Sequence, residues 1–222
     1  KKRLINIFFF FFCFMVNVAQ YNALKQQLSN DGVGLVAVTK LRSIAEIQAL
    51  YDLGHRVFGE NRVQELLDKQ QQLPQDIEWH FIGHLQRNKV KYIAPFVAVI
   101  HAIDSWELLQ TVEREATKCG RAINCLLQVH IAQESNKFGM TDDELLGLWE
   151  QQDLSKLSAA RVVGLMGMAT FTEDLEQIRS EFRHLSRLFA YLQQHNMHQI
   201  PLSTLSMGMS GDFALAIAEG AT

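Results

Sequence analysis

The chain has 222 residues, enough for one sizeable hydrophobic core and within the usual length of a single α/β barrel. Its 21 Lys and Arg residues against 24 Asp and Glu give a net charge of -3, and no dense basic stripe occurs, which argues against a nucleic-acid-binding protein. The cysteines, Cys13, Cys119 and Cys125, form neither a CxxC pair nor an even set, so we expect reduced thiols, a cytoplasmic protein and no zinc site.

Residues 1–18 form an atypical amino-terminal segment, in which three basic residues precede an apolar stretch from Leu4 to Val18. The stretch is shorter than the ~20 residues that span a bilayer, and Asn17-Val18-Ala19 is a poor cleavage pattern. Three interpretations stay open: an export or anchor segment, a buried terminal segment, or an artefact of where the sequence starts. We leave these residues outside the predicted fold and expect no membrane association unless this segment is functional.

Short apolar runs alternate with amphipathic helical patterns from residue 34 onward, which is typical of successive βα units around a parallel sheet. The expected strands are residues 35–38, 56–61, 78–83, 97–104, 123–132, 162–170 and 202–208. The expected helices are residues 43–54, 62–73, 85–95, 105–120, 141–152, 173–195 and 210–220. Ser43, Ser105 and Thr141 are predicted N-caps, and Glu144 completes a capping box with Thr141.

Seven βα units favour a closed barrel of the TIM type over an open doubly wound sheet, which would need about five or six strands. After Gly220 no further apolar run follows. The sequence therefore predicts an α/β fold over residues 19–222, a modified TIM (β/α)8 barrel from which the final strand is missing. Either the sequence is a truncated fragment or the sheet is open at one edge.

Thr39 and Lys40 directly follow the first apolar run, in the stretch "GLVAVTKLRS". Partial desolvation lowers the pKa of a lysine from roughly 10.4 and makes the neutral, nucleophilic amine available for Schiff-base formation. The alternative is a lysine that has simply emerged into solvent. The rest of the chain has to decide between the two.

Polar residues gather after the other predicted strands as well, and in a parallel barrel all these positions lie on one face. They are Glu60, Asn61, His84, Gln86, Arg87, Asn88, Lys89, Asp104, Asn136, Lys137, Ser206, Gly208, Ser210 and Asp212. The loop "LSMGMSGD" is the most informative, because Gly208 permits close approach of the backbone to a ligand and Ser206 and Ser210 supply hydroxyl groups before a helix. Such a loop favours a phosphate, although an ordinary helix N-cap is the alternative. With a Schiff-base lysine, it indicates a phosphorylated aldehyde.

A metal site is not expected. His80 and His84 are four residues apart, but the segment is predicted as a strand and its exit, and no third ligand follows. We therefore assign no metal ligands.

Six motifs in order carry a resemblance to a known family, with a coverage from about Tyr21 to Thr222. They are "AVTK", "FGENRVQE", "EWHFIGHLQRNK", "QESNKFG", "GLMGMA" and "LSMGMSGD". Together they resemble the pyridoxal phosphate homeostasis protein family, also called the proline synthase co-transcribed proteins.

The resemblance implies the fold of the alanine racemase amino-terminal domain and pyridoxal 5'-phosphate (PLP) as cofactor. It implies that Lys40 forms the internal aldimine, that Asn61 lies near the ring, and that Ser206 and Ser210 lie near the phosphate. Members of the family continue past the equivalent of "AIAEGAT" into a strand with an Arg-Ile-Gly motif, which this sequence does not contain.

The leading hypothesis is a non-catalytic PLP-binding protein in intracellular PLP homeostasis, with Lys40, Asn61, Ser206, Gly208 and Ser210 as cofactor-binding residues. Its expected partners are PLP and, as recipients, PLP-dependent apoenzymes, and we expect a monomer without catalytic residues. Two alternatives stay open: a PLP-dependent, racemase-like enzyme acting on amino acids, and a cofactor-free Schiff-base aldolase acting on a sugar phosphate.

Overall fold

The computed structural model describes residues 3–7, 17–134, 137–196 and 199–222. Eight parallel strands form one sheet in which every strand lies beside its neighbours in chain order. The strands are β1 (Arg3–Ile7), β2 (Val33–Val38), β3 (Val57–Glu60), β4 (Glu78–Phe81), β5 (Val99–Ile103), β6 (Ile123–Val129), β7 (Ala160–Gly167) and β8 (Thr204–Ser206).

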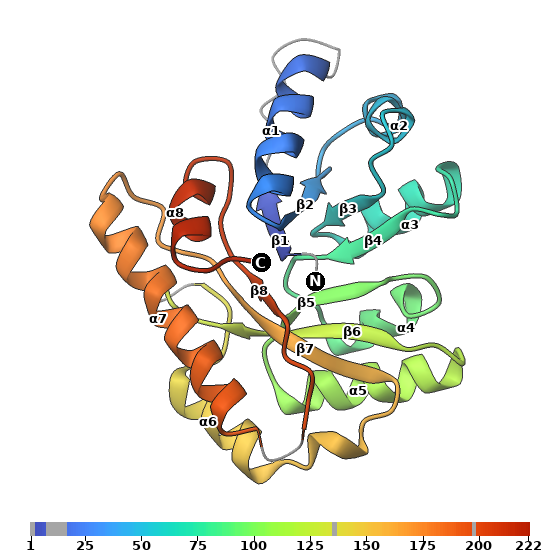
Figure 1. Cartoon of the computed structure of the whole chain (residues 1–222). Coiled ribbons are helices and arrows are strands. Elements are labelled where there is room, and N and C mark those ends of the chain that lie inside the picture. Colours follow the sequence, from blue (N-terminus) through green and yellow to red (C-terminus); the bar gives the residue numbers. More distant parts are fainter. Residues whose placement is uncertain (1–2, 8–16, 135–136, 197–198) are drawn as a thin grey trace.

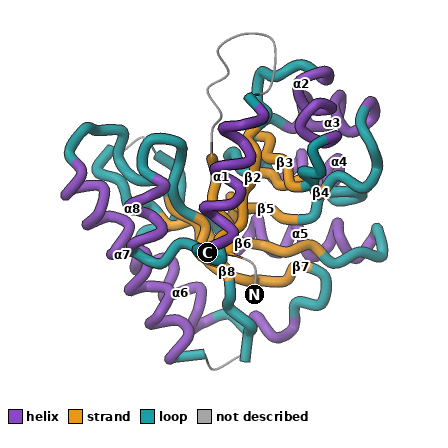
Figure 2. The backbone as a smooth tube through the Cα atoms, turned by 45° about the horizontal axis from the view of Figure 1, so that its top comes forward, coloured by secondary structure: helices purple, strands orange, loops and turns teal. Residues whose placement is uncertain are grey.

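Helices lie on the outside of the curled sheet, as the two views show (Figure 1 and Figure 2). The α-helices are α1 (Val18–Asn30), α2 (Ile44–Asp52), α3 (Val63–Gln72), α4 (Val90–Ile93), α5 (Trp106–Lys118), α6 (Asp142–Gln151), α7 (Leu175–Gln194) and α8 (Phe213–Ala218). Two short 3-10 helices, Arg87–Lys89 and Leu154–Lys156, precede α4 and β7. The predicted modified TIM-type barrel with alternating strands and helices is confirmed.

The local signals at the helix ends act as expected. Ser43 and Thr141 each form a capping box with the glutamate three residues later, and Ser105 accepts the backbone N–H of Leu108. Gly54 and Gly120 follow α2 and α5 with φ values of 84° and 63°, so glycine ends each helix in the left-handed region.

The structure differs from the sequence-based expectation at the amino terminus. Residues 3–7, which the prediction left outside the fold, form β1 and pair in parallel with residues 33–37 of β2. β1 also contacts β8, so the curled sheet brings its two edge strands together. Thr222 occupies part of the β8 edge, donating its N–H to the carbonyl of Leu205 at 3.0 Å. The other residues of the predicted amino-terminal segment, apart from 17 and 18, lie outside the described part of the chain.

Alternation along the strands separates two sets of side chains. In β6, Cys125 and Leu127 belong to the large apolar core shared with the helices. The intervening Leu126 belongs to a small cluster with Val99 and Met166 on the other side of the sheet. The polar strand residues His80, His101, Gln128 and Ser206 lie on this inner side by the same alternation, so the sheet fixes their positions.

None of the helices in the described part of the chain combines the length and the apolar character that crossing a membrane requires.

Candidate functional site

A cavity of about 240 Å³ lies where the strands end at their carboxyl termini. Lys40 after β2, Asn61 after β3 and Gly208 after β8 all line it. The remaining lining residues are Ile82, Gly83, His84, Gln128, Phe138, Met166, Gly167, Met168, Ala169, Phe182, Met207, Met209 and Asp212. Residues far apart in the sequence therefore line one cavity, because the carboxyl ends of parallel strands lie on the same face of the barrel.

Lys40 is half-buried and lies in a tight turn directly after β2. The carbonyl of Thr39 accepts the N–H of Arg42 at 2.9 Å, and Leu41 has φ 61°. A hydrogen bond from residue i+3 to residue i, with positive φ at i+2, is the pattern of a type II β-turn, which usually has glycine or asparagine at that position. The turn therefore places Lys40 at its second position and holds a leucine in an unfavourable backbone conformation.

Asn61 is held in place by its backbone. A Cβ atom added to Gly83 would lie 2.2 Å from the carbonyl oxygen of Asn61, so only glycine allows the exit of β4 to pack so closely against Asn61. The side-chain oxygen Oδ1 of Asn61 is buried and has no hydrogen-bond partner among the described residues. An unsatisfied buried acceptor beside a cavity is costly for the protein alone, and a ligand or an ordered water molecule in the cavity can supply the missing donor.

The loop after β8 supplies a second wall of the cavity. Gly208 has φ 92°, and a Cβ atom there would lie 2.7 Å from the Cβ of Ala216 in α8. Asp212 is buried and accepts the N–H of Met209, which closes the loop. Burial raises the pKa of Asp212. The hydroxyl oxygen of Ser210 is buried without a hydrogen-bond partner in the described part of the chain.

Ser206 lies deeper than predicted. It is fully buried, and its hydroxyl contacts Nδ1 of His101 at 3.0 Å. Nε2 of His101 in turn contacts Nδ1 of His80 at 2.9 Å. Burial, followed by the neighbouring His80, holds the pKa of His101 well below its ordinary value, so the ring is neutral. Strand residues on the inner side thus form a hydrogen-bonded chain from His80 through His101 to Ser206.

His84 and Phe138 form part of the rim. Their rings stack with centroids 4.1 Å apart, and Nδ1 of His84 lies 3.0 Å from a carboxylate oxygen of Asp104. Asn61 and His84 also line an adjacent hollow of about 490 Å³ with Arg62, Gln86 and Lys89. The two residues therefore stand between the cavity of Lys40 and a more open, basic depression.

The structure distributes the predicted ring of polar residues over the cavity and its surroundings. Lys40, Asn61, His84, Gly208 and Asp212 line the cavity. Ser206 lies behind it and Ser210 lies on its loop, while Gln86, Arg87, Asn88 and Lys89 line neighbouring hollows. The ammonium of Lys137 donates to the carbonyl of Ala169 at 2.6 Å. Asn136 lies outside the described residues.

Sequence reasoning missed His101, Gln128 and Phe138. His101 and Gln128 are polar residues within apolar strands, and two-residue alternation places them on the inner side with His80 and Ser206. This alternation is the sequence signal from which His101 and Gln128 could have been predicted. His80 and His84 do not converge, because one contacts His101 and the other Asp104. In the described part of the chain no three His, Cys, Asp or Glu residues are grouped as metal ligands.

The family model described as alanine racemase, N-terminal domain, matches residues 18–221. The chain is 41% identical over 177 residues to the pyridoxal phosphate homeostasis protein of Aquifex aeolicus, covering 79% of this chain and 76% of the relative. It is 38% identical over 192 residues to the protein of the same name from Synechocystis, covering 86% of each.

Among solved structures, PipY of Synechococcus elongatus with PLP bound matches with a TM-score of 0.83 and 37% identity, covering 92% of this chain and 94% of PipY. Alanine racemase from Bartonella henselae matches with a TM-score of 0.66 and 16% identity, and 56% of that enzyme is covered. The second likeness is one of fold alone.

Proposed function

This chain belongs to the pyridoxal phosphate homeostasis protein family, and from this premise we propose that it holds PLP on Lys40 in intracellular PLP homeostasis, without catalysis of its own. PLP supplies an aldehyde that condenses reversibly with a primary amine, with loss of water. The observation that carries the proposal is that Lys40 and the loop after β8 line one cavity. An amine and an expected phosphate-binding loop are thus available to the same small molecule.

The residues present fit such a ligand. The cavity volume of about 240 Å³ lies just below the range for small-ligand pockets, which begins at about 300 Å³. Asn61 Oδ1 and Ser210 Oγ are buried polar atoms whose hydrogen-bonding capacity is unused within the described residues. In this proposal Ser210 donates to the phosphate, Asn61 accepts from the ring substituents, and Gly208 keeps the loop in its left-handed conformation.

Ser206 takes an indirect part in the proposed site. Its hydroxyl is fully buried against His101, so we assign it to the base of the phosphate-binding loop. Since it immediately precedes the loop that lines the cavity, it fixes where that loop leaves β8.

The proposed role is storage without catalysis. An aldehyde linked to Lys40 is protected from other amines, and reversible exchange allows its release. The proposed recipients are PLP-dependent apoenzymes, and the proposed form is a cytoplasmic monomer. The relatives carry the name of a homeostasis protein rather than that of an enzyme, which supports the assignment.

The test uses the visible absorption that appears when the protein is mixed with PLP. Borohydride reduction followed by peptide mapping should place the label on Lys40. Lys40→Ala should lose the label and the visible band with an unchanged unfolding temperature, because a half-buried turn lysine contributes little packing. A label that persists on other residues in Lys40→Ala would contradict the site assignment.

A racemase-like enzyme is the alternative, and the alanine racemase family model is the observation in its favour. The support is limited to the fold, because the matched racemase is 16% identical. Steady conversion of L-alanine to D-alanine by the PLP-loaded protein, abolished in Lys40→Ala, would decide for the enzyme.

A further inference from the structure

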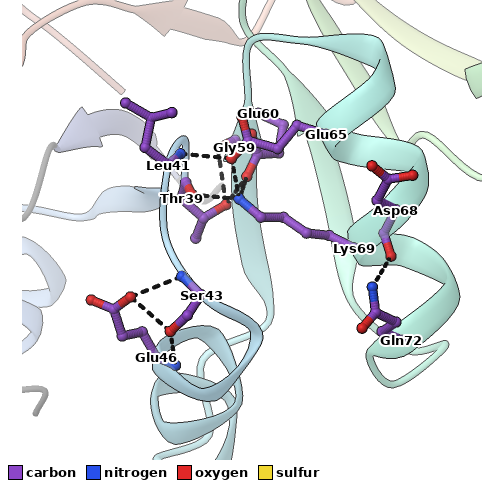
Figure 3. A network of polar contacts seen from close by, with 10 residues as sticks. All are labelled: Thr39, Leu41, Ser43, Glu46, Gly59, Glu60, Glu65, Asp68, Lys69 and Gln72. Atoms are coloured by element: carbon purple, nitrogen blue, oxygen red, sulfur yellow. Dashed lines mark hydrogen bonds and ion pairs between the residues drawn. The ribbon is translucent and has the colours of Figure 1, made fainter. Parts of the chain in front are cut away.

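We propose that Glu65 and Lys69 of α3, together with Glu60 at the end of β3, are positioning residues that hold the turn of Lys40 in the conformation that presents its amine to the cavity. The inference rests on the proposed function for what the amine does, and it adds residues that do not line the cavity. Figure 3 shows the cluster beneath the turn.

The turn needs outside support because its third residue is a leucine. Leu41 has φ 61°, a left-handed backbone conformation that is strained for a residue with a Cβ atom. Its side chain is 81% exposed, so packing of that side chain does not hold the conformation. The support therefore has to come from contacts that other residues make with the backbone of the turn.

Glu65 supplies that support on one side of Lys40. The N–H of Leu41 donates to Oε1 of Glu65 at 2.6 Å, a short hydrogen bond to a carboxylate. The hydrogen bond from the N–H of Leu108 to Ser105 lies within one helix cap. The hydrogen bond from the N–H of Leu41 to Glu65 instead joins two different βα units. Burial acts to raise the pKa of Glu65, but the hydrogen bonds from Lys69 and from the N–H of Leu41 oppose it, and the pKa of Glu65 is lowered.

Lys69 and Glu60 hold the other side of Lys40. The ammonium of Lys69 donates to the carbonyl of Thr39 at 2.6 Å, and the hydroxyl of Thr39 donates to Oε1 of Glu60 at 2.5 Å. The same ammonium donates to Glu60 and Glu65, each at 2.6 Å. All three protons of Lys69 are therefore used, and two of the three acceptors are the carboxylates that hold the turn.

Burial makes the cluster rigid. The side chain of Lys69 is 6% exposed and that of Glu60 is fully buried, so solvent does not compete for these contacts. Thr39 and Leu41, the two neighbours of Lys40 in sequence, are both bound to the cluster, whereas Lys40 itself lines the cavity. The fold thus fixes the backbone on either side of Lys40, which itself lines the cavity.

The expected consequence is a loss of affinity without a loss of the reacting group. A displacement of about 1 Å in a reactive group costs up to about a hundredfold in reactivity. Removing Glu65 frees the N–H of Leu41 and lets the turn relax toward negative φ. The amine of Lys40 would then reach the aldehyde carbon of PLP less often.

The experiment measures two quantities in Glu65→Ala. In the protein without ligand, the amide hydrogen of Leu41 should exchange at least about tenfold faster than in the wild type. The dissociation constant for PLP should rise by about tenfold or more. Asp68→Ala is the matched control, because Asp68 lies on the same helix and contacts Gln64 and Gln72 instead of the turn. That control should change neither quantity.

Rescue separates positioning from a general structural role. Leu41→Gly removes the cost of positive φ, so the double variant Glu65→Ala/Leu41→Gly should bind PLP within about threefold of the wild type. Binding is measured well below the unfolding temperature of every variant, so that a general change in stability does not alter the dissociation constant. Unchanged binding in Glu65→Ala, or no recovery in the double variant, would overturn the inference.

Failure of the proposed function gives a different result. If the wild type forms no borohydride-stable linkage at Lys40, the proposed function fails. Exchange of the Leu41 amide hydrogen then decides by itself whether Glu65 holds the turn: faster exchange in Glu65→Ala supports that role, and unchanged exchange refutes it.

Discussion

The turns after β2 and β8 both place a residue with positive φ beside the cavity, and they achieve it by different means. After β8 the residue is Gly208, with φ 92°, which has no Cβ atom to strain and which packs against Ala216. After β2 the residue is Leu41, with φ 61°, and the conformation depends on the charged cluster of Glu65 and Lys69. The turn after β8 adopts positive φ because its own sequence has a glycine there, whereas the turn after β2 depends on side chains of the neighbouring helix α3.

The difference has a physical consequence for each wall of the site. A glycine turn is broken only by substitution within it or in the helix that it contacts. The lysine turn can be released from a distance, by changing side chains that touch no ligand. The following predictions test this contrast, from the largest expected effect to the smallest.

Lys69→Met should have the largest effect. It leaves Glu60 and Glu65 without their cation, and breaking a buried ion pair by removing one partner costs about 3–5 kcal/mol. The desolvated carboxylate of Glu60 would then be unpaired. Urea unfolding should show this loss in the free energy of unfolding.

Lys91→Met is a suitable control, since Lys91 is an exposed lysine of α4 that contacts the face of Tyr92. It should change the free energy of unfolding by less than about 0.5 kcal/mol. Equal stability of Lys69→Met and the wild type would show that the cluster is dispensable and that the turn of Leu41 needs no support.

Gly208→Ala should come next. The added Cβ atom would lie 2.7 Å from the Cβ of Ala216 and 3.2 Å from the Cα of Phe213, in a backbone conformation that side chains rarely adopt. Strain and overpacking together should cost about 2–3 kcal/mol. Chemical unfolding measures it, and PLP binding should weaken as well, because the loop has to move. The control is Gly211→Ala in the same loop, where an added Cβ atom meets no other atom within 4 Å.

The same contrast explains why one turn could be predicted from the sequence and the other could not. Periodicity and caps are local, so the order of strands and helices was predictable, and parallel strands then bring Lys40 and Gly208 to one face. A glycine before a helix also signals its backbone conformation. The spacing of Glu65 and Lys69 gives no such signal, because i,i+4 pairs of opposite charge are ordinary on helix surfaces. Only the three-dimensional structure shows that Lys69 is buried beneath Thr39.

The amino-terminal strand was unpredictable for another reason. Residues 3–7 pair with β2 by backbone hydrogen bonds, which any sequence can make, and an apolar stretch after basic residues equally fits an export segment. The deep position of Ser206 also depends on a partner, His101, that is 105 residues away in the chain.

Lowering the pH should destabilise the region around β8 more than the turn after β2. The pKa of His101 is held well below its ordinary value in the folded protein, whereas in the unfolded chain it takes up a proton near pH 6.5. The unfolded state therefore binds more protons as the pH falls below about 6.5, and the folded state loses stability, by at most about 1.4 kcal/mol per pH unit for this one group.

The measurement compares the pH dependence of the free energy of unfolding in the wild type and in His101→Asn, which should have a smaller slope between about pH 6.5 and pH 5. His55, whose pKa burial lowers to about 4, contributes in the same direction, and Glu60, whose pKa burial raises, in the opposite one. Both are present in both proteins. An identical slope in the two proteins would contradict the assignment of a neutral, titration-resistant His101.

Leu41→Gly should have the smallest effect on stability, and it bears most directly on the contrast between the turns. Glycine removes the roughly 1–2 kcal/mol cost of positive φ, but it adds conformational entropy to the unfolded chain, worth about 0.5–1 kcal/mol. The exposed leucine side chain contributes little packing, so the net change should be a stabilisation of less than about 1 kcal/mol. Leu41→Ala keeps the cost and should change stability by less than about 0.5 kcal/mol. Thermal unfolding of the two variants side by side measures the difference. If glycine destabilised the protein more than alanine did, the turn would not be strained by its leucine, and the cluster of Glu65 and Lys69 would stabilise the fold in some way other than by supporting Leu41.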